Sequence, residues 1–163
     1  MPHKNNLQYQ SDMIFGFSEE ERIQPILEAK FGALKKLDKY NPFDFENEVY
    51  LIEVKSRRIN HNKYNTLMFS YSKIEKLEGY EDEKIAIFVF NCDDGIYYWE
   101  YDKTEFTIGK GGRCDRGCNE YTTMAYIDIK HLEQLDESIT FNKEEEEEEE
   151  KESCCECLKS KEQ

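Results

Sequence analysis

The chain has 163 residues, a length that fits one domain with its own hydrophobic core. A hydrophobic fraction of 38% and an aromatic fraction of 13% exclude a chain that is disordered throughout. The formal net charge is −14, so a nucleic-acid partner would require a local basic patch. No apolar run reaches the roughly 18 residues of a membrane-spanning helix, and the polar N-terminus lacks the apolar core of a secretory signal. We therefore expect an intracellular protein, cytoplasmic or nuclear, with no membrane partner.

Composition divides the chain into three parts. We expect residues 1–15 to form a loose lead-in, residues 16–142 a single domain, and residues 143–163 a disordered, acidic tail that contains cysteines. The tail holds ten acids and four lysines, a net charge of −6. The other residues keep 26 acids and 18 bases, a net charge of −8, so the domain is acidic even without its tail.

The six cysteines are expected to be free thiols, because disulfides are rare inside cells. They stand at positions 92, 114, 118, 154, 155 and 157. None of these spacings is the C-x2-C pair typical of zinc sites. A structural zinc ion held by Cys114, Cys118 and the tail cysteines is therefore the less favoured alternative.

The first elements in chain order are a helix and a hairpin. Ser18 followed by Glu21 is a capping-box pattern, which predicts a helix that begins there and ends near Gly32. A short strand is expected over residues 33–38. Residues 43–45 and 49–57 predict two strands joined by a tight turn.

The second half of the domain is expected to alternate a helix with strands. Apolar spacing predicts a helix over residues 66–77, and residues 84–91, KIAIFVFN, predict a strand buried on both faces. An Asp-Gly turn then leads into a returning strand. Further elements are expected at residues 96–101, 106–108 and 121–129 (strands) and 131–135 (a short helix). This order predicts an α/β or α+β domain with a mixed central sheet.

A cluster of charged residues lies within the predicted hairpin. Strand alternation places Glu53 and Lys55 on one face, and the short turn brings Asp44 beside Glu53. Two carboxylates on adjacent strands suit Mg²⁺ or Mn²⁺, and a nearby lysine can orient a water and offset developing charge. The set predicts metal-assisted hydrolysis of phosphodiester bonds. The alternative is an ordinary surface ion pair between Glu53 and Lys55.

The order of these residues resembles the signature of the PD-(D/E)XK nucleases, the restriction-endonuclease-like superfamily. The matching segments are Pro-Phe-Asp at 42–44 and Glu-Val-Lys at 53–55. The elements predicted over residues 17–102 follow the same core order of helix, three strands, helix and strand. One departure is that the aspartate follows Pro-Phe instead of following proline directly.

The resemblance implies a role for each matching residue. Asp44 and Glu53 would bind the metal ion together with the main-chain carbonyl of Val54, and Lys55 would be the catalytic lysine. Glu28 on the first helix would be a further catalytic and metal-binding acid. The composition also resembles that of proteins of large DNA viruses, which would place the protein in a host cell.

Basic residues near the acidic pair could contact the phosphates that flank the scissile bond. Arg57 and Arg58 are expected to point to opposite sides, because neighbours alternate in a strand. The glycine-rich basic loop at residues 109–116 is a second candidate contact, with a plain hairpin turn as the alternative. The candidate nucleic-acid-binding residues are Arg57, Arg58, Lys63, Lys73, Arg113 and Arg116.

The leading hypothesis is a Mg²⁺- or Mn²⁺-dependent nuclease whose partner is nucleic acid, with DNA as the expected substrate. The complete set of two acids and a lysine favours it. The acidic domain favours a second hypothesis, a catalytically inactive protein of the same fold that binds nucleic acid or acts in assembly. A third is a structural or host-interaction protein. A homodimer is an open alternative to a monomer, since many enzymes of this fold act as dimers.

Overall fold

The computed structural model describes residues 3–112 and 122–135. A long helix, α1 (His3–Phe31), is followed by a six-stranded sheet, a three-stranded sheet and a short helix, α2 (Ser72–Glu78). The large sheet has the order β1-β2-β3-β5-β6-β9 and the small sheet the order β4-β8-β7. Their bounds are β1 (Lys35–Lys36), β2 (Phe45–Glu46), β3 (Tyr50–Ser56), β4 (Thr66–Ser70), β5 (Ile85–Cys92), β6 (Gly95–Glu100), β7 (Phe106–Gly111), β8 (Thr122–Asp128) and β9 (Glu133–Gln134), with a 3₁₀ turn at Ile129–His131.

The large sheet is mixed, as the sequence predicts. Its two longest strands, β3 and β5, run parallel, and every other pair in the sheet is antiparallel. The fold is therefore α+β and consistent with a restriction-endonuclease-like core. None of the described helices is both long and apolar enough to cross a membrane.

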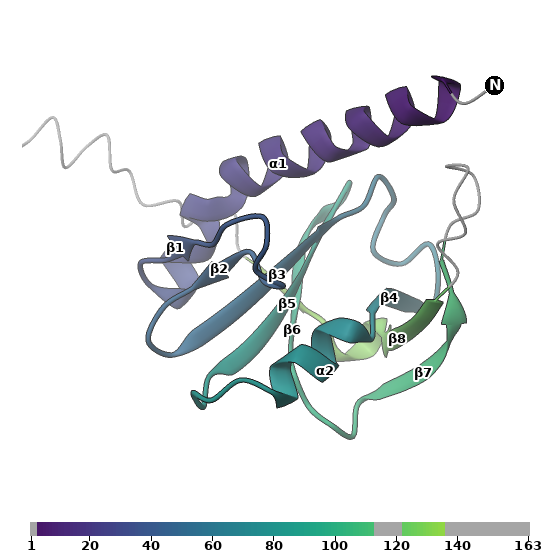
Figure 1. The fold of residues 1–163 in the computed structure, drawn as a ribbon. Helices are drawn as coiled ribbons and strands as arrows, with labels where there is room; N and C mark the ends of the chain where they lie inside the picture. The colour runs from purple at the N-terminus through teal and green to yellow at the C-terminus, as the bar shows by residue number, and fades with distance from the viewer. Residues whose placement is uncertain (1–2, 113–121, 136–163) are drawn as a thin grey trace, which may run out of the picture.

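The large sheet separates two hydrophobic layers (Figure 1). Helix α1 covers one face, where Ile23 and Leu27 pack against Ile52 and Val54 of β3. Helix α2 and the small sheet cover the other face, where the core includes Phe69, Phe88 and Trp99. Strand β5 lies between the layers and is buried from Ala86 onward, which confirms the predicted central strand.

Helix α1 begins much earlier than the sequence pattern indicated. Residues 3–15, expected to be a loose lead-in, are helical, and Ser18 lies inside the helix, where its hydroxyl donates to the carbonyl of Phe15. None of residues 7–22 is buried, so the first half of the helix carries no apolar periodicity to reveal it. Its end is as predicted, because Gly32 adopts a φ of 86°.

Two segments that were predicted as helices each contain a strand in the structure. Residues 66–70 form β4, in which Leu67 and Phe69 are buried and pair with Ile127 and Ala125 of β8. Only residues 72–78 are helical, so the apolar pattern that suggested one helix combines a strand, with a period of two, and a helix of about two turns. At residues 131–135, the expected short helix is a 3₁₀ turn followed by β9, which extends the sheet beside β6.

A buried asparagine joins helix α1 to the ends of β3 and β5. Asn91 is 5% exposed, and its amide donates to Glu19 (2.7 Å) and to the hydroxyl of Ser56 (3.2 Å). Its oxygen accepts from Arg22 at 3.2 Å, and Arg22 also pairs with Glu19. The first hydrophobic layer is thus closed at this end by polar contacts.

Replacing Asn91 by alanine should lower the free energy of unfolding by about 1–2 kcal/mol, because three polar partners lose their contacts in a buried place. Urea denaturation would measure the change, with Asn62→Ala on an exposed loop as the matched control. Equal stability of the two variants would contradict this account of the contacts.

Candidate active site

The predicted hairpin forms, and it places Asp44 beside β3. Phe45 pairs with Ile52, so Asp44, the residue before β2, lies opposite Glu53. The turn is fixed by Asn47, whose side-chain oxygen accepts from the N–H groups of Val49 (2.9 Å) and Tyr50 (2.7 Å).

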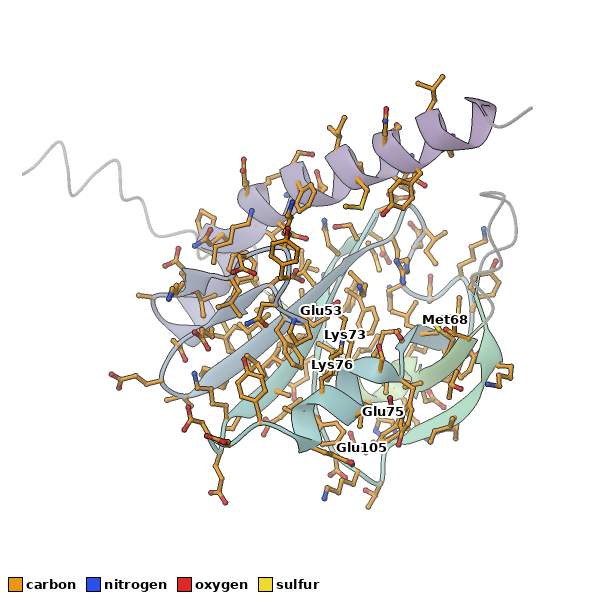
Figure 2. All side chains as sticks on the ribbon, in the orientation of Figure 1. Glu53, Met68, Lys73, Glu75, Lys76 and Glu105 are labelled. Atoms are coloured by element: carbon orange, nitrogen blue, oxygen red, sulfur yellow. The ribbon has the colours of Figure 1, made fainter. Side chains whose placement is uncertain are left out.

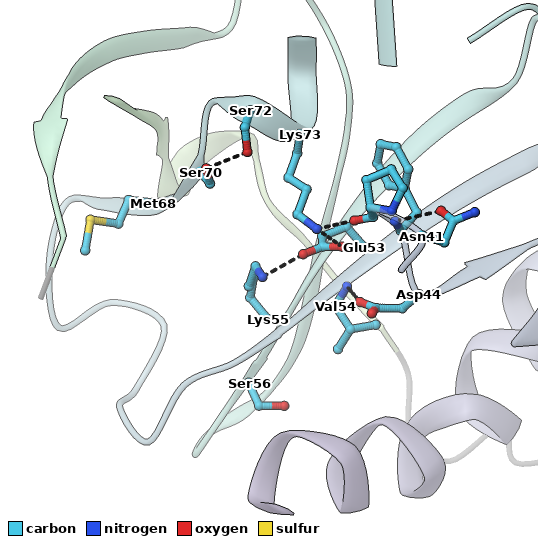
Figure 3. Close-up of polar contacts among 12 residues, drawn as sticks. Asn41, Asp44, Glu53, Val54, Lys55, Ser56, Met68, Ser70, Ser72 and Lys73 are labelled. Carbon is cyan, nitrogen blue, oxygen red and sulfur yellow. Dashed lines mark hydrogen bonds and ion pairs between the residues drawn. The ribbon is translucent and has the colours of Figure 1, made fainter. Parts of the chain in front are cut away.

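The carboxylate of Asp44 closes the edge of β3 beyond the last residue of β2. Its backbone N–H donates to the carbonyl of Ile52 (2.9 Å), and its Oδ2 accepts from the N–H of Val54 (2.7 Å) (Figure 3). In a strand the N–H and C=O of one residue point to the same edge. The Val54 carbonyl is therefore directed to the edge where the Asp44 carboxylate lies.

Glu53 is the centre of the cluster. It is 2% exposed, and its Oε1 lies 2.6 Å from the Lys55 ammonium. Its Oε2 lies 3.3 Å from the ammonium of Lys73, which itself donates to the Pro42 carbonyl (Figure 3). Despite that proximity, Oε2 accepts no hydrogen bond from any described residue. The Glu53 carboxylate is thus buried and lies near two ammonium groups, whereas both partners of an ordinary surface ion pair are exposed to solvent.

Negative charge accumulates at this edge of the sheet. Burial, followed by the nearby charges of Glu53 and Glu20, raises the pKa of Asp44 to about 7. Burial likewise raises the pKa of Glu20, a residue of α1 whose carboxylate lies 3.8 Å from Lys36. A divalent cation bound here would offset the repulsion between the charges of Asp44 and Glu53.

The residues present fit a hard divalent cation. Two carboxylates, those of Asp44 and Glu53, and the carbonyl of Val54 are all oxygen donors of the kind that Mg²⁺ and Mn²⁺ prefer. Within residues 3–112 and 122–135, no three His, Cys, Asp or Glu side chains gather as a metal-binding group. The donor set therefore consists of two side chains and a main-chain oxygen, with water completing the coordination.

The acid that α1 contributes is Glu20 and not Glu28. The carboxylate of Glu28 accepts a hydrogen bond from the backbone of Leu34 (3.1 Å) and so stabilises the chain after the helix end. Glu20 interacts electrostatically with both Asp44 and Glu53. A signal for it exists in the sequence, because Glu20 stands three and seven residues before Ile23 and Leu27 and shares their core-facing side.

Helix α2 contributes Lys73 to the site. Figure 2 shows Lys73 next to Glu53, whereas Lys76, one turn further along the helix, is exposed. Predicted as a nucleic-acid contact, Lys73 instead has its ammonium among the catalytic candidates, in contact with Glu53 and Pro42.

The other predicted basic residues that the structure describes make contacts away from the Glu53 carboxylate. Arg57 contacts the carbonyl of Met68 at 3.4 Å, and Arg58 lies over the ring of Phe15 at 4.1 Å. Lys63 is exposed and lies 5.5 Å from the ring centre of Tyr64. Arg113 and Arg116 lie outside the described residues, as do all the cysteines except Cys92, which is a buried free thiol.

A groove of about 450 Å³ adjoins the acidic pair on the side of α1. One wall comes from the first two thirds of α1, and the other comes from the end of β3 and the two residues after it. Each wall contains both polar and apolar side chains. The lining residues are Gln8, Asp12, Met13, Phe15, Gly16, Glu20, Val54, Lys55, Ser56, Arg57 and Arg58.

The family model described as "Phage putative PDDEXK endonuclease" matches residues 8–135. The chain belongs to this family. The match confirms the PD-(D/E)XK superfamily predicted from the sequence, and it includes residues 8–17 of α1, which the sequence pattern had not assigned to the helix. No curated protein matches the chain at a significant level.

Proposed function

We propose that this member of the PDDEXK family is a metal-dependent nuclease that hydrolyses phosphodiester bonds of nucleic acid, with DNA as the expected substrate. The observation that carries the proposal is the convergence of Asp44, Glu53 and Lys55 at one edge of β3, where the Val54 carbonyl also points. Mg²⁺ or Mn²⁺ is the cofactor that this donor set suits.

Each residue has a role that follows from its position. Asp44, Glu53 and the Val54 carbonyl would hold the cation, which when bound polarises the phosphate and lowers the pKa of the attacking water. Lys55 is 29% exposed on its side chain, so its ammonium reaches both Glu53 and the solvent side, where it can orient a water and stabilise charge on the phosphate. The ammonium of Lys73, 3.3 Å from the second oxygen of Glu53, would offset the negative charge of that carboxylate.

The direct test is cleavage of labelled single-stranded, duplex and branched DNA, and of RNA, with Mg²⁺ or Mn²⁺. Wild type should cut at least one of these substrates, cutting should stop when EDTA removes the metal, and Glu53→Ala and Lys55→Ala should each reduce the rate by about 10³-fold or more. Glu75→Ala on the exposed side of α2 is the matched control.

The same experiment tests the second candidate, a protein of this fold that binds nucleic acid without cutting it. The net charge of −8 outside the tail weakens non-specific attraction to DNA, so either candidate should bind nucleic acid weakly without a divalent cation. A folded wild type that cuts no substrate with either metal would refute the nuclease and leave the binding protein. The intracellular location and a homodimeric state stay predictions.

A further inference from the structure

The groove beside the acidic pair has the size and chemistry of a site for one unpaired stretch of nucleic acid. Its volume of about 450 Å³ is in the range of small-molecule sites. That is room for the base and sugar of one flanking nucleotide. It shares Val54 and Lys55 with the catalytic hairpin, so its occupant would be continuous with the scissile phosphate.

The α1 wall is built along one line of the helix. Gln8, Asp12, Gly16 and Glu20 follow one another at intervals of four residues and all line the groove. Gly16 leaves open space, since a Cβ placed on it would meet no atom within 4 Å. The wall is therefore indented at its middle, opposite the end of β3.

The two walls together carry stacking surfaces and positive charge, because the ring of Phe15 belongs to α1 and the cations belong to the facing wall. The guanidinium of Arg58 lies 4.1 Å over the ring of Phe15, and Lys55 and Arg57 add two further cations. Aromatic rings and guanidinium planes are the surfaces on which unpaired bases stack. The acids Asp12 and Glu20 also line the groove. Three cations and two acids cannot neutralise the many phosphates that duplex binding requires, whereas one strand needs few such contacts.

The segment that carries the two arginines is fixed by a second contact. His61, four residues after Arg57, contacts Asp94 of the β5–β6 turn through its backbone N–H (2.8 Å) and its Nδ1 (2.5 Å). Its ring also stacks on Tyr97 at 4.0 Å. The arginines are thus presented from a loop that is tied at both ends to the large sheet.

We infer that this groove binds an unpaired strand next to the scissile phosphate, so that the substrate is single-stranded nucleic acid or the unpaired arm of a branched duplex. The inference rests on the proposed function for what happens at the phosphate, and on the groove alone for what is bound.

Fluorescence anisotropy of the full chain tests the inference without any need for cleavage. The probes are a labelled single-stranded DNA, the RNA of the same sequence and the blunt DNA duplex, each with Ca²⁺ in place of Mg²⁺. Single strands should bind at least about tenfold more tightly than the duplex, because stacking on the groove is available only to unpaired bases. The DNA and RNA arms show which sugar is preferred.

Gly16→Leu is the decisive variant. Leucine has a higher helix propensity than glycine, so the helix should be at least as stable while the side chain fills the groove. Single-strand binding should weaken about tenfold or more, and Arg58→Ala should weaken it in the same direction. The matched controls are Ser18→Leu, on an exposed position of α1, and Lys39→Ala, an exposed basic residue that lies over the ring of Tyr40 and outside the groove.

The outcomes separate the two proposals. Duplex binding as tight as single-strand binding, no measurable binding, or full binding by Gly16→Leu would overturn the assignment of the groove. Groove-dependent binding of single strands in a protein that cuts nothing would support the assignment while the proposed nuclease failed.

Discussion

Replacing Asp44 by asparagine should make the metal-free protein more stable and reduce cleavage by about 10³-fold or more. Asparagine keeps an oxygen that can accept from the Val54 N–H, so the edge of β3 stays closed. It removes a buried negative charge that lies near Glu53 and Glu20. The same change removes a charged ligand of the proposed cation, and activity and stability therefore move in opposite directions.

The gain in stability has a definite pH dependence. The pKa of Asp44 is about 7 in the folded protein against an ordinary value of 3.8, so ionisation of this group opposes folding. The penalty is absent below about pH 4, grows as the pH rises toward 7 and is complete above it. At pH 8 in EDTA, Asp44→Asn should raise the free energy of unfolding by an amount on the order of 1–3 kcal/mol.

Thermal and urea denaturation at pH 4 and pH 8 would measure the difference, with the exposed Asp82→Asn as control. Added Mg²⁺ should stabilise wild type and leave Asp44→Asn unchanged, because a ligand stabilises only a protein that binds it. A variant that is less stable than wild type at pH 8 in EDTA would refute the electrostatic account of this edge.

Phe69→Ala should lower the free energy of unfolding by about 3–5 kcal/mol. Phe69 is fully buried and stacks on Phe88 at 4.2 Å, with the ring of Trp99 at 6.2 Å. It joins β4 of the small sheet to β5 of the large sheet, so its removal leaves a cavity between the two sheets.

Urea denaturation would measure the loss, with Tyr64→Ala, which is 58% exposed, as control. Phe69→Leu should recover much of the stability, because it keeps most of the buried volume. A loss below about 1 kcal/mol for Phe69→Ala would show that the small sheet is not held to the large sheet through this contact.

The catalytic candidates could be predicted from the sequence because their placement is local. Asp44 and Glu53 are nine positions apart, and strand alternation with a tight turn is enough to bring them together. The central strand β5 was equally clear, since its apolar run is unbroken. Both signals lie within a few residues of the feature they predict.

The parts that could not be predicted depend on distant partners. Strand β4 is a strand because β8, more than 50 residues later, pairs with it, and its apolar spacing also fits a helix. Asn91 gains its role from an approach between α1 and the sheet that no local pattern encodes, whereas the spacing of Glu20 from Ile23 and Leu27 indicates only which side of the helix it occupies. The first half of α1 lacks an apolar stripe on the core side, so hydrophobic periodicity could not predict that residues 3–15 are helical.

The contacts that hold the hairpin with Asp44 and Glu53 are largely separate from the residues that line the groove. The geometry of the hairpin is set by its own ladder and by the Asn47 turn, whereas the groove walls come from α1 and from the loop after β3. Substitutions in those walls can change which strand is admitted without moving the carboxylates. Engineering of specificity could therefore vary α1 and the β3–β4 loop as a library while leaving residues 42–55 constant.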